Sequence, residues 1–285
     1  MPELPEVECV RKGLARARLG GAVVALRWRS SQLLRTGAFW RDERLELLDG
    51  ATTGTFDRRG KFLIWRFASA GSVPLGLVVH LGMTGRVTVT KPGADRVPHT
   101  HLVFELDNGR ALHFSDPRRF GGVHVDSLDR LARVGPLAEL GPEPLQSGFD
   151  GTVLQEQVRG STRALRDVLL DQRVVAGLGN IYVSEALFLA GLHPLTRANT
   201  LRASAWTRLA EAVVTVLQQG IDNGGTTLRD YRGAGGERGS NQNALLVYGR
   251  ADAPCTVCGA PLIGYTHGGR SGVFCRTCQP RRRRR

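Results

Sequence analysis

Four cysteines near the carboxyl end constrain the fold of this chain more than any other feature of its sequence. They form two Cys-x-x-Cys pairs, Cys255 with Cys258 and Cys275 with Cys278, and 16 residues separate the pairs. Because two residues between thiolates allow one tight turn to place both sulfurs on one ion, this spacing predicts a four-cysteine zinc site. A pair of disulfide bonds is the alternative, and the lack of a secretory signal argues against it.

The residues between the two pairs predict a β-hairpin stapled by the metal. Segments 261–265 and 271–275 read as short strands around the run His267-Gly268-Gly269-Arg270, so Arg270 is expected near the tip. Four thiolates complete the tetrahedral coordination of a zinc ion and leave no coordination position open for a substrate or water. The single zinc ion is therefore predicted to be structural and not catalytic.

Short alternating segments predict a β-sandwich or barrel in the first half of the chain. Asp107-Asn108-Gly109 is a strong hairpin signal between two of them, and Arg58-Arg59-Gly60 indicates another tight turn. The expected strands cover residues 22–29, 52–57, 61–67, 76–80, 86–90, 101–106, 110–114 and 122–125.

The pattern becomes helical in the second half. Residues 135–151 hold four glycines and three prolines and read as a linker. Helical spacing then follows at 153–158, 164–171, 181–190 and 204–220, before a glycine-rich loop at 224–239. The predicted α+β architecture divides into a β-rich domain (1–135), a linker (136–150), a helical domain (151–240), a cysteine hairpin (241–280) and a basic tail (281–285).

The charge of the chain predicts a polyanionic partner. The chain has 39 Lys and Arg residues and 26 Asp and Glu residues, which gives a formal net charge of +13. Without the five arginines of the tail the net charge is still +8 (13 − 5). A basic surface attracts nucleic acid most commonly, and an anionic membrane is the rival. No apolar run reaches the ~20 residues that a spanning helix needs. We therefore expect a soluble intracellular protein that binds nucleic acid.

The first residues suggest a nucleophile. If Met1 is removed, Pro2 becomes a secondary amine, and an α-amino group titrates near ~8. Such an amine can attack an aldehyde-level carbon and form an iminium, with Glu3 beside it as a proton donor or acceptor. The alternative is a capped helix over residues 5–19, in which Pro5 and Glu6 suit the first turn.

Three further loops carry candidate contacts. Gly177-Leu178-Gly179-Asn180 opens a predicted helix that could bind one phosphate, with Asn180 as cap or donor; a plain cap is the alternative. Met83 in one loop, and Arg118 with Phe120 in another, could wedge into a DNA base step. Ordinary core packing is the alternative for both apolar side chains.

Together these motifs resemble the formamidopyrimidine-DNA glycosylase family of bacterial repair enzymes. The resemblance covers nearly the whole chain, and its motifs occur in the family's order: PELPEVE, RRGK, HLGM, DPRRFGG, LDQRVVAGLGNIYVSEAL, GGTTLRD, and VYGR before the cysteines. It implies a β-sandwich domain followed by a helix–two-turn–helix domain with a zinc finger.

The resemblance also implies the activity. A bifunctional DNA glycosylase/AP lyase would flip an oxidised purine, mainly 8-oxoguanine opposite cytosine or a formamidopyrimidine, out of double-stranded DNA. Pro2 would attack C1′ and expel the base, Glu3 would donate the proton that opens the sugar ring, and Glu6 would support them. Strand cleavage would follow by β- and δ-elimination.

Other roles carry over by position. Lys61 matches a lysine that acts in β-elimination, although a solvated lysine at a strand start is the alternative. Arg270 matches an arginine that grips the phosphates and assists δ-elimination, and His99 and Asn180 match further phosphate contacts. The void left by the flipped base would be filled by Met83, Arg118 and Phe120.

The chain departs from the family pattern in three places. Gly239-Ser240-Asn241-Gln242 stands where the family usually has Gly-Tyr-Phe before a Gln, in the loop that covers the extruded base. Residues 160–163 lack the lysines of many members, and the arginines at 281–285 are an addition that would act as an electrostatic anchor.

Two other functions stay open from the sequence. One is an enzyme similar to endonuclease VIII that removes oxidised pyrimidines, and the other is a zinc-dependent protein that binds damaged DNA without catalysis. In each case we expect a monomer in the bacterial cytoplasm, associated with the nucleoid. Its expected partner is double-stranded DNA that contains oxidised bases or abasic sites. We expect no binding to a membrane.

Overall fold

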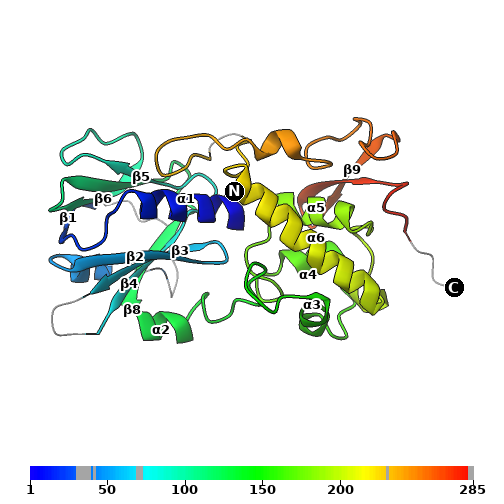
Figure 1. Cartoon of the computed structure of the whole chain (residues 1–285), viewed down its shortest axis with the longest axis horizontal. Coiled ribbons are helices and arrows are strands. Elements are labelled where there is room, and N and C mark those ends of the chain that lie inside the picture. The colour runs from blue at the N-terminus through cyan, green and yellow to red at the C-terminus, as the bar shows by residue number, and fades with distance from the viewer. Residues whose placement is uncertain (30–39, 41–42, 69–72, 229–230, 282–285) are drawn as a thin grey trace. The chain divides into compact units, whose positions relative to one another are not determined.

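The computed structural model describes residues 1–285 except 30–39, 41–42, 69–72, 229–230 and 282–285. Four of the five tail arginines therefore lie outside the described residues. The contacts group the chain into two units, Met1–Glu139 with Asn223–Ser240, and Leu140–Asp222 with Asn241–Arg285. The first unit holds the helix α1 and the strands β1 to β8, and the second holds the helices α3 to α6 and a hairpin (Figure 1).

Two four-stranded antiparallel sheets form the first unit, in the orders β1-β6-β7-β5 and β2-β3-β4-β8. This confirms the predicted β-sandwich, because each of the eight expected segments is a strand. The strands are β1 (Val24–Arg29), β2 (Thr52–Arg59), β3 (Phe62–Ala68), β4 (Leu75–His80), β5 (Arg86–Thr90), β6 (Thr100–Leu106), β7 (Arg110–Ser115) and β8 (Gly122–Ser127).

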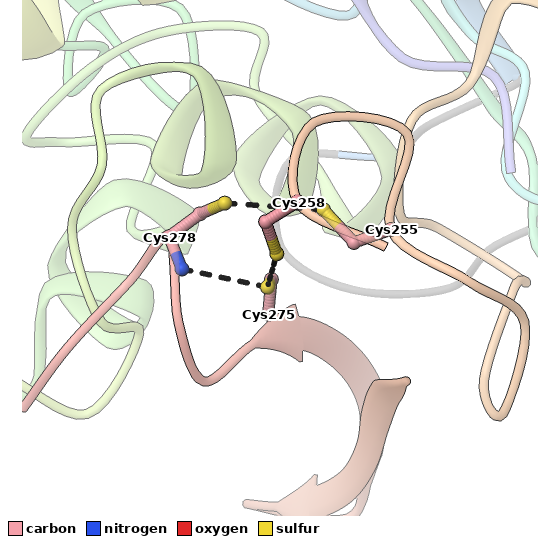
Figure 2. Close-up of side chains that lie close together, drawn as sticks. All are labelled: Cys255, Cys258, Cys275 and Cys278. Carbon is pink, nitrogen blue, oxygen red and sulfur yellow. Dashed lines mark hydrogen bonds between the residues drawn. The ribbon is translucent and has the colours of Figure 1, made fainter. Parts of the chain in front are cut away.

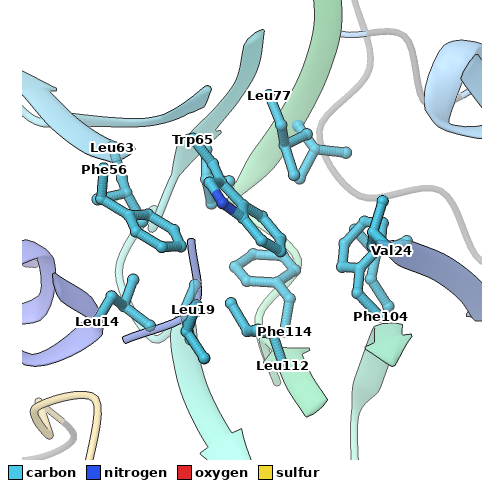
Figure 3. Close-up of a cluster of buried hydrophobic side chains, with 14 of the residues drawn as sticks. Leu14, Leu19, Val24, Phe56, Leu63, Trp65, Leu77, Phe104, Leu112 and Phe114 are labelled. Carbon is cyan, nitrogen blue, oxygen red and sulfur yellow. The ribbon is translucent and has the colours of Figure 1, made fainter. Parts of the chain in front are cut away.

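Aromatic rings fill the space between the two sheets. Trp65 on β3 stacks on Phe56 with ring centroids 5.0 Å apart and meets Phe67 at 4.6 Å. The Trp65 ring also lies nearly perpendicular to that of Phe104 on β6 of the opposite sheet, with centroids 5.9 Å apart (Figure 3). Such pairs add about 0.5–1.5 kcal/mol each to the free energy of burial, so Trp65 fixes how the sheets face each other.

Helix α1 (Leu4–Arg16) packs one face against β2. Leu4, Val7 and Leu14 recur at helical spacing and are fully buried. The helix is three residues shorter than expected because Arg18 takes a left-handed conformation (φ 53°) just beyond its end. Cys9 on this helix is half-buried, and burial, followed by the charge of Glu6, raises the pKa of its thiol to about 11.

Two short helices accompany these strands, one between β1 and β2 and one after β8. The 3-10 helix η1 (Glu43–Leu48) and the helix α2 (Leu128–Arg133) were not predicted from the sequence. In α2 the hydroxyl of Ser127 accepts a hydrogen bond from the N–H of Arg130, which caps the helix. Six residues hold too few turns for a periodic pattern to emerge.

Residues 223–240 group with the first unit, whereas the sequence suggested one helical domain over 151–240. Two contacts tie this loop to α1 and β5. The hydroxyl of Tyr231 donates to the carbonyl of Glu6 (3.3 Å), and the N–H of Val89 donates to the carbonyl of Ala234 (3.2 Å).

The second unit consists of helices and one hairpin. A side chain at Gly220 would clash with the ring of Tyr182, so α5 and α6 approach closely at this glycine. None of the described helices has the length and apolarity needed to cross a membrane. The elements are α3 (Gly151–Gln157), α4 (Leu165–Leu170), α5 (Asn180–Leu189), η2 (Ala198–Thr200), α6 (Ala203–Asp222), η3 (Asn241–Ala244), β9 (Leu262–His267) and β10 (Arg270–Cys275).

Candidate functional site

The four cysteines converge beside the hairpin (Figure 2). Their sulfurs all lie within 4.8 Å of one another. The Sγ atoms of Cys255 and Cys278 are 3.9 Å apart, and those of Cys258 and Cys275 are 3.5 Å apart. Four tetrahedral bonds of about 2.3 Å to one metal would separate the sulfurs by about 3.8 Å. The cluster can therefore hold a metal ion.

Local turns place the sulfurs there. The N–H of Gly259 donates to the carbonyl of Cys255 (2.9 Å), with Gly259 in a left-handed conformation (φ 74°) that favours glycine. The N–H of Cys278 donates to Cys275 Sγ (3.4 Å). A hydrogen bond from the backbone at Ala260 lowers the pKa of the Cys258 thiol to about 7, so this ligand loses its proton readily.

Pro2 and Glu3 lie buried at the start of α1, behind Met1, which is 52% exposed. Glu3 is the N-cap of α1, and it forms a capping box with Glu6. The N–H of Glu3 donates to Glu6 Oε2 at 2.8 Å. The start of the chain is therefore fixed in place rather than trailing in solvent.

Glu6 also holds the loop 223–240. Its second oxygen, Oε1, accepts a hydrogen bond from the N–H of Thr226 at 2.7 Å. With only 1% of its surface exposed, the Glu6 carboxylate thus joins two segments that are 220 residues apart in the sequence. At the other end of this loop, the Ser240 hydroxyl donates to the carbonyl of Asn223 (3.1 Å), so the departure from the family pattern at Ser240 leaves the loop anchored.

Asp116 is a buried carboxylate that joins two loops of the sandwich. Its Oδ2 accepts the N–H of Gly121 (2.7 Å), and its Oδ1 accepts the N–H of Arg118 (3.3 Å) and the hydroxyl of Thr84. Thr84 lies next to Met83, so the loop with Met83 is tied to the loop with Arg118 and Phe120. The backbone of Asp116 adds a third segment, since its N–H donates to the carbonyl of His99 (3.0 Å).

Four predicted contact residues lie in the segments that Asp116 joins, and their side chains face solvent: Met83, His99, Arg118 and Phe120. Met83 is 38% exposed and Phe120 50% exposed, which contradicts the alternative of ordinary core packing. The guanidinium of Arg118 lies over the Phe120 ring, 4.7 Å from its centroid. His99 is exposed and left-handed (φ 64°), a strained conformation that its carbonyl's bond to Asp116 helps to hold.

Removing the Asp116 carboxylate is expected to destabilise the first unit. Asp116→Ala leaves the N–H of Gly121 and the hydroxyl of Thr84 without their acceptor, while the N–H of Arg118 keeps Thr84 Oγ1 (3.2 Å), so the free energy of unfolding should fall by about 2 kcal/mol. Asp95→Ala, at an exposed carboxylate of the nearby loop, is the matched control and should change it by less than about 0.5 kcal/mol. Urea unfolding followed by circular dichroism measures both, and equal values for the two variants would contradict the role of Asp116.

Lys61 forms the β2–β3 turn with Gly60 and is only 6% exposed. The alternative of a solvated lysine at a strand start is therefore wrong. A buried ammonium group is costly unless polar partners surround it, so the position is one where a lysine serves a purpose beyond solubility.

Asn180 is the first residue of α5, and Gly179 is the N-cap. The alternative that Asn180 caps the helix is wrong, because its amide turns to the hairpin instead. Its Nδ2 donates to the carbonyl of Ser271 (2.9 Å), and its Oδ1 accepts from Arg166 (2.6 Å). The amide thus connects the start of α5 with the residue that follows Arg270.

Arg166 was not predicted, and it organises this region. Its side chain is 1% exposed and donates to the carbonyls of His267 (3.3 Å), Arg270 (3.1 Å) and Ser271 (2.9 Å). The hairpin turn is Gly268–Gly269, so the exposed Arg270 lies beside the tip as expected. Asn180 and Arg270 are therefore brought together by one buried arginine.

The sequence departs from the family pattern again at Arg163, whose guanidinium pairs with Asp171 at 3.0 Å. The guanidinium of Arg173, and then that of Arg163, hold the pKa of the Asp171 carboxyl well below its usual range. Arg163 is therefore engaged within the second unit.

The predicted site residues divide between the two units. The second unit holds Asn180, Arg270 and the four cysteines. The first unit holds Pro2, Glu3, Glu6, Lys61, Met83, His99, Arg118 and Phe120.

Comparison with known proteins gives matches over the whole chain. The family model of the formamidopyrimidine-DNA glycosylase N-terminal domain matches residues 1–123, and that of the formamidopyrimidine-DNA glycosylase H2TH domain matches residues 140–232. The formamidopyrimidine-DNA glycosylase of Gluconobacter oxydans (strain 621H) is 42% identical over 290 residues, which cover 98% of this chain and 100% of the relative.

Two solved structures of the Lactococcus lactis enzyme are also similar. One is its complex with a DNA containing an abasic site, and the other is the complex of the wild-type protein with a DNA containing N7-benzyl-Fapy-dG. Each has a TM-score of 0.87 and 35% sequence identity, and each alignment covers 98% of this chain and 100% of the relative.

Proposed function

The chain belongs to the formamidopyrimidine-DNA glycosylase family, and we propose from this that Pro2, freed of Met1, is its catalytic nucleophile. The protein is a DNA glycosylase that removes oxidised purines, and its partner is double-stranded DNA with damaged or abasic sites. The observation that carries the proposed mechanism is the pair Pro2 and Glu3, buried and held by Glu6 at the start of α1.

The amine of Pro2 suits an attack on C1′ of the damaged nucleotide. Its lone pair forms the N–C1′ bond while the electrons of the glycosidic bond leave with the base, which takes up a proton. The nitrogen then loses its own proton to solvent, the lone pair that this frees expels O4′, and Glu3 gives that oxygen a proton as the sugar ring opens. Because the amine is secondary, the resulting iminium keeps its positive charge and cannot revert to a neutral imine.

The cationic iminium draws electrons from C2′ and makes its hydrogens acidic. Loss of one proton from C2′ expels the 3′ phosphate in a β-elimination, and a second elimination expels the 5′ phosphate. We assign Lys61 to the β-elimination, as proton donor and phosphate contact, and Arg270 to the phosphates and the δ-elimination. Burial of Lys61 at a two-residue turn is consistent with a fixed position for its ammonium group.

The exposed cluster around Asp116 suits the space that a flipped base leaves. Unstacking one nucleotide costs about a few kcal/mol, and side chains inserted into the gap offset part of it. We propose that Met83 and Phe120 fill the gap, with Arg118 facing the cytosine opposite the lesion. The cation–π contact between Arg118 and Phe120 supports a joint insertion.

In the second unit we assign a structural zinc ion to the four cysteines. Their number, thiol chemistry and sulfur separations fit zinc, which would cross-link the two turns at the base of the hairpin. The hairpin in turn carries Arg270 beside the start of α5, and a helix start suits one phosphate, with Asn180 as a further contact. His99 in the first unit is assigned another phosphate.

A comparison of substrates tests the proposed function. Single-turnover excision should be about 10²-fold or more faster on an 8-oxoguanine:cytosine duplex than on the same duplex with thymine glycol, because specificity is a difference in transition-state binding. Equal or reversed rates would instead assign the chain to oxidised pyrimidines. We further propose that the protein acts as a monomer on the nucleoid of a bacterial cytoplasm.

A further inference from the structure

An open hollow of about 960 Å³ lies in the second unit, away from the hairpin tip. It is lined by the segment after α5 and by residues at the base of the hairpin, at the end opposite Arg270. The volume lies at the upper end of the range of about 300–1,000 Å³ found for ligand pockets. None of the described residues that line it carries a carboxylate.

Three arginines give this hollow an uncompensated positive charge. Arg197, Arg276 and Arg281 line it and are exposed. Within the described part of the chain, none of their guanidinium groups takes part in an ion pair. By contrast, Arg163 and Arg173 of the same unit both pair with Asp171. Guanidinium groups without partners at one hollow indicate an anionic ligand.

Flat rings stand beside these arginines. His193 and Phe274 line the hollow, and their rings meet edge to face with centroids 4.6 Å apart. Nδ1 of His193 accepts the N–H of Leu195 (3.1 Å), so a neutral ring keeps its own proton on Nε2. Ile263, 37% exposed, adds an apolar patch. Aromatic rings next to arginines form the usual platform for unstacked bases.

The hollow is separate from the phosphate contacts assigned to Arg270. Phe274 lies four residues further along β10, which corresponds to about 13 Å at about 3.3 Å per residue. Both residues point to the same face of the hairpin because strand side chains alternate with a period of two. A phosphate at Arg270 therefore cannot also occupy the hollow, although both sites open on one face.

We propose that this hollow is a second nucleic-acid site, which binds an unpaired DNA strand with phosphates on Arg197 and Arg276 and a base against Phe274 and His193. The site goes beyond the proposed glycosylase function and needs none of its catalytic residues. The shared chemistry is that of a phosphorylated nucleoside, so a free nucleotide is the other possible source of the ligand.

Binding of a labelled oligonucleotide to protein already saturated with duplex tests this site. The full-length protein with its metal is saturated with an unlabelled duplex that carries a tetrahydrofuran abasic analogue, and fluorescein-labelled dT6 is then titrated by anisotropy. We expect dT6 to bind, and the double substitution Arg197→Ala with Arg276→Ala to weaken it about tenfold at low salt. The slope of log K against log salt should fall by about 1.4, since each phosphate contact to a single strand contributes about 0.7.

Matched variants separate this site from general basicity. Arg202→Ala with Arg208→Ala removes two exposed arginines of the same unit that lie outside the hollow, and should alter dT6 binding less than twofold. Phe274→Leu should weaken binding about fivefold without changing the salt slope, because stacking is lost and charge is kept. Thermal melting checks that each variant is folded.

Three results would overturn the proposal. They are no dT6 binding to the duplex-saturated protein, an equal loss in the two arginine pairs, or competition by dTMP as strong as that by unlabelled dT6. Equally strong competition by dTMP would show that the ligand of the hollow is a free nucleotide and not a DNA strand. None of these results depends on whether excision occurs, so a failure of the glycosylase mechanism would be recognised separately.

Discussion

Replacing Pro2 with glycine is expected to lower single-turnover excision of 8-oxoguanine by about 10³-fold, since removing a covalent nucleophile typically costs at least this much. Glycine retains an amine, but a primary one on a flexible residue that no longer packs at the start of α1. Its imine can also lose a proton, which removes the charge that drives elimination. The measurements are excision rates and the yield of borohydride-trapped protein–DNA adduct.

Pro5→Ala is the matched control for this substitution. Pro5 lies in the same short motif and is equally buried, but it is the second residue of the helix and its nitrogen is never free. Pro5→Ala should therefore keep the adduct and lose only some stability. Protein whose Met1 is retained, identified by mass spectrometry, should give no adduct. A full adduct yield from Pro2→Gly or from the Met1 form would exclude Pro2 as the nucleophile.

Cys258→Ser is expected to abolish metal binding and, as a consequence, to weaken the affinity of the protein for DNA. Structural zinc in small domains contributes an apparent ~10–16 kcal/mol, far more than a hairpin of two six-residue strands gains from its own packing. Elemental analysis should fall from about one zinc per chain to almost none, and affinity for lesion-containing duplex should fall by at least about 10²-fold. The affinity falls because the position of Arg270 depends on the hairpin.

Cys9→Ser provides the control, since Cys9 lies on α1 in the other unit and takes no part in the cluster. This variant should keep the metal and the affinity. Folded wild-type protein without stoichiometric metal, or a Cys258→Ser variant that still binds one equivalent, would contradict a four-thiolate site. A metal other than zinc in that analysis would correct the identity of the ion and leave the cluster intact.

Features that follow a local period were predicted well from the sequence. The eight expected segments are all strands, even where residues on both faces are buried, as in β4 and β7, and the turns carry the glycines that their backbone requires. The cysteine pairs and the Gly268–Gly269 turn that define the hairpin all lie within fewer than thirty consecutive residues. The hairpin could therefore be predicted without knowledge of the rest of the chain.

Features that rest on single buried polar groups were not predicted. Arg166 bonds carbonyls more than one hundred residues away, and Glu185 accepts the backbone N–H groups of Leu246, Val247 and Tyr248. A charged residue inside an apolar helical pattern looks like a surface position. Such a residue stabilises the fold by bonding distant backbone groups. Every residue type carries these groups, so no local sequence pattern predicts the bonds. The hydrogen bonds that join Asn180 to the hairpin were missed for the same reason.

The Glu6 carboxylate links two processes that would otherwise be independent. Moving the loop 223–240 away would break the hydrogen bond from the N–H of Thr226 to Oε1, and breaking a hydrogen bond to a buried carboxylate costs about 1–3 kcal/mol. The same carboxylate would then be free to rotate and loosen its hold on Glu3. The position of the loop and the order of the start of the chain are thus thermodynamically coupled through this one carboxylate.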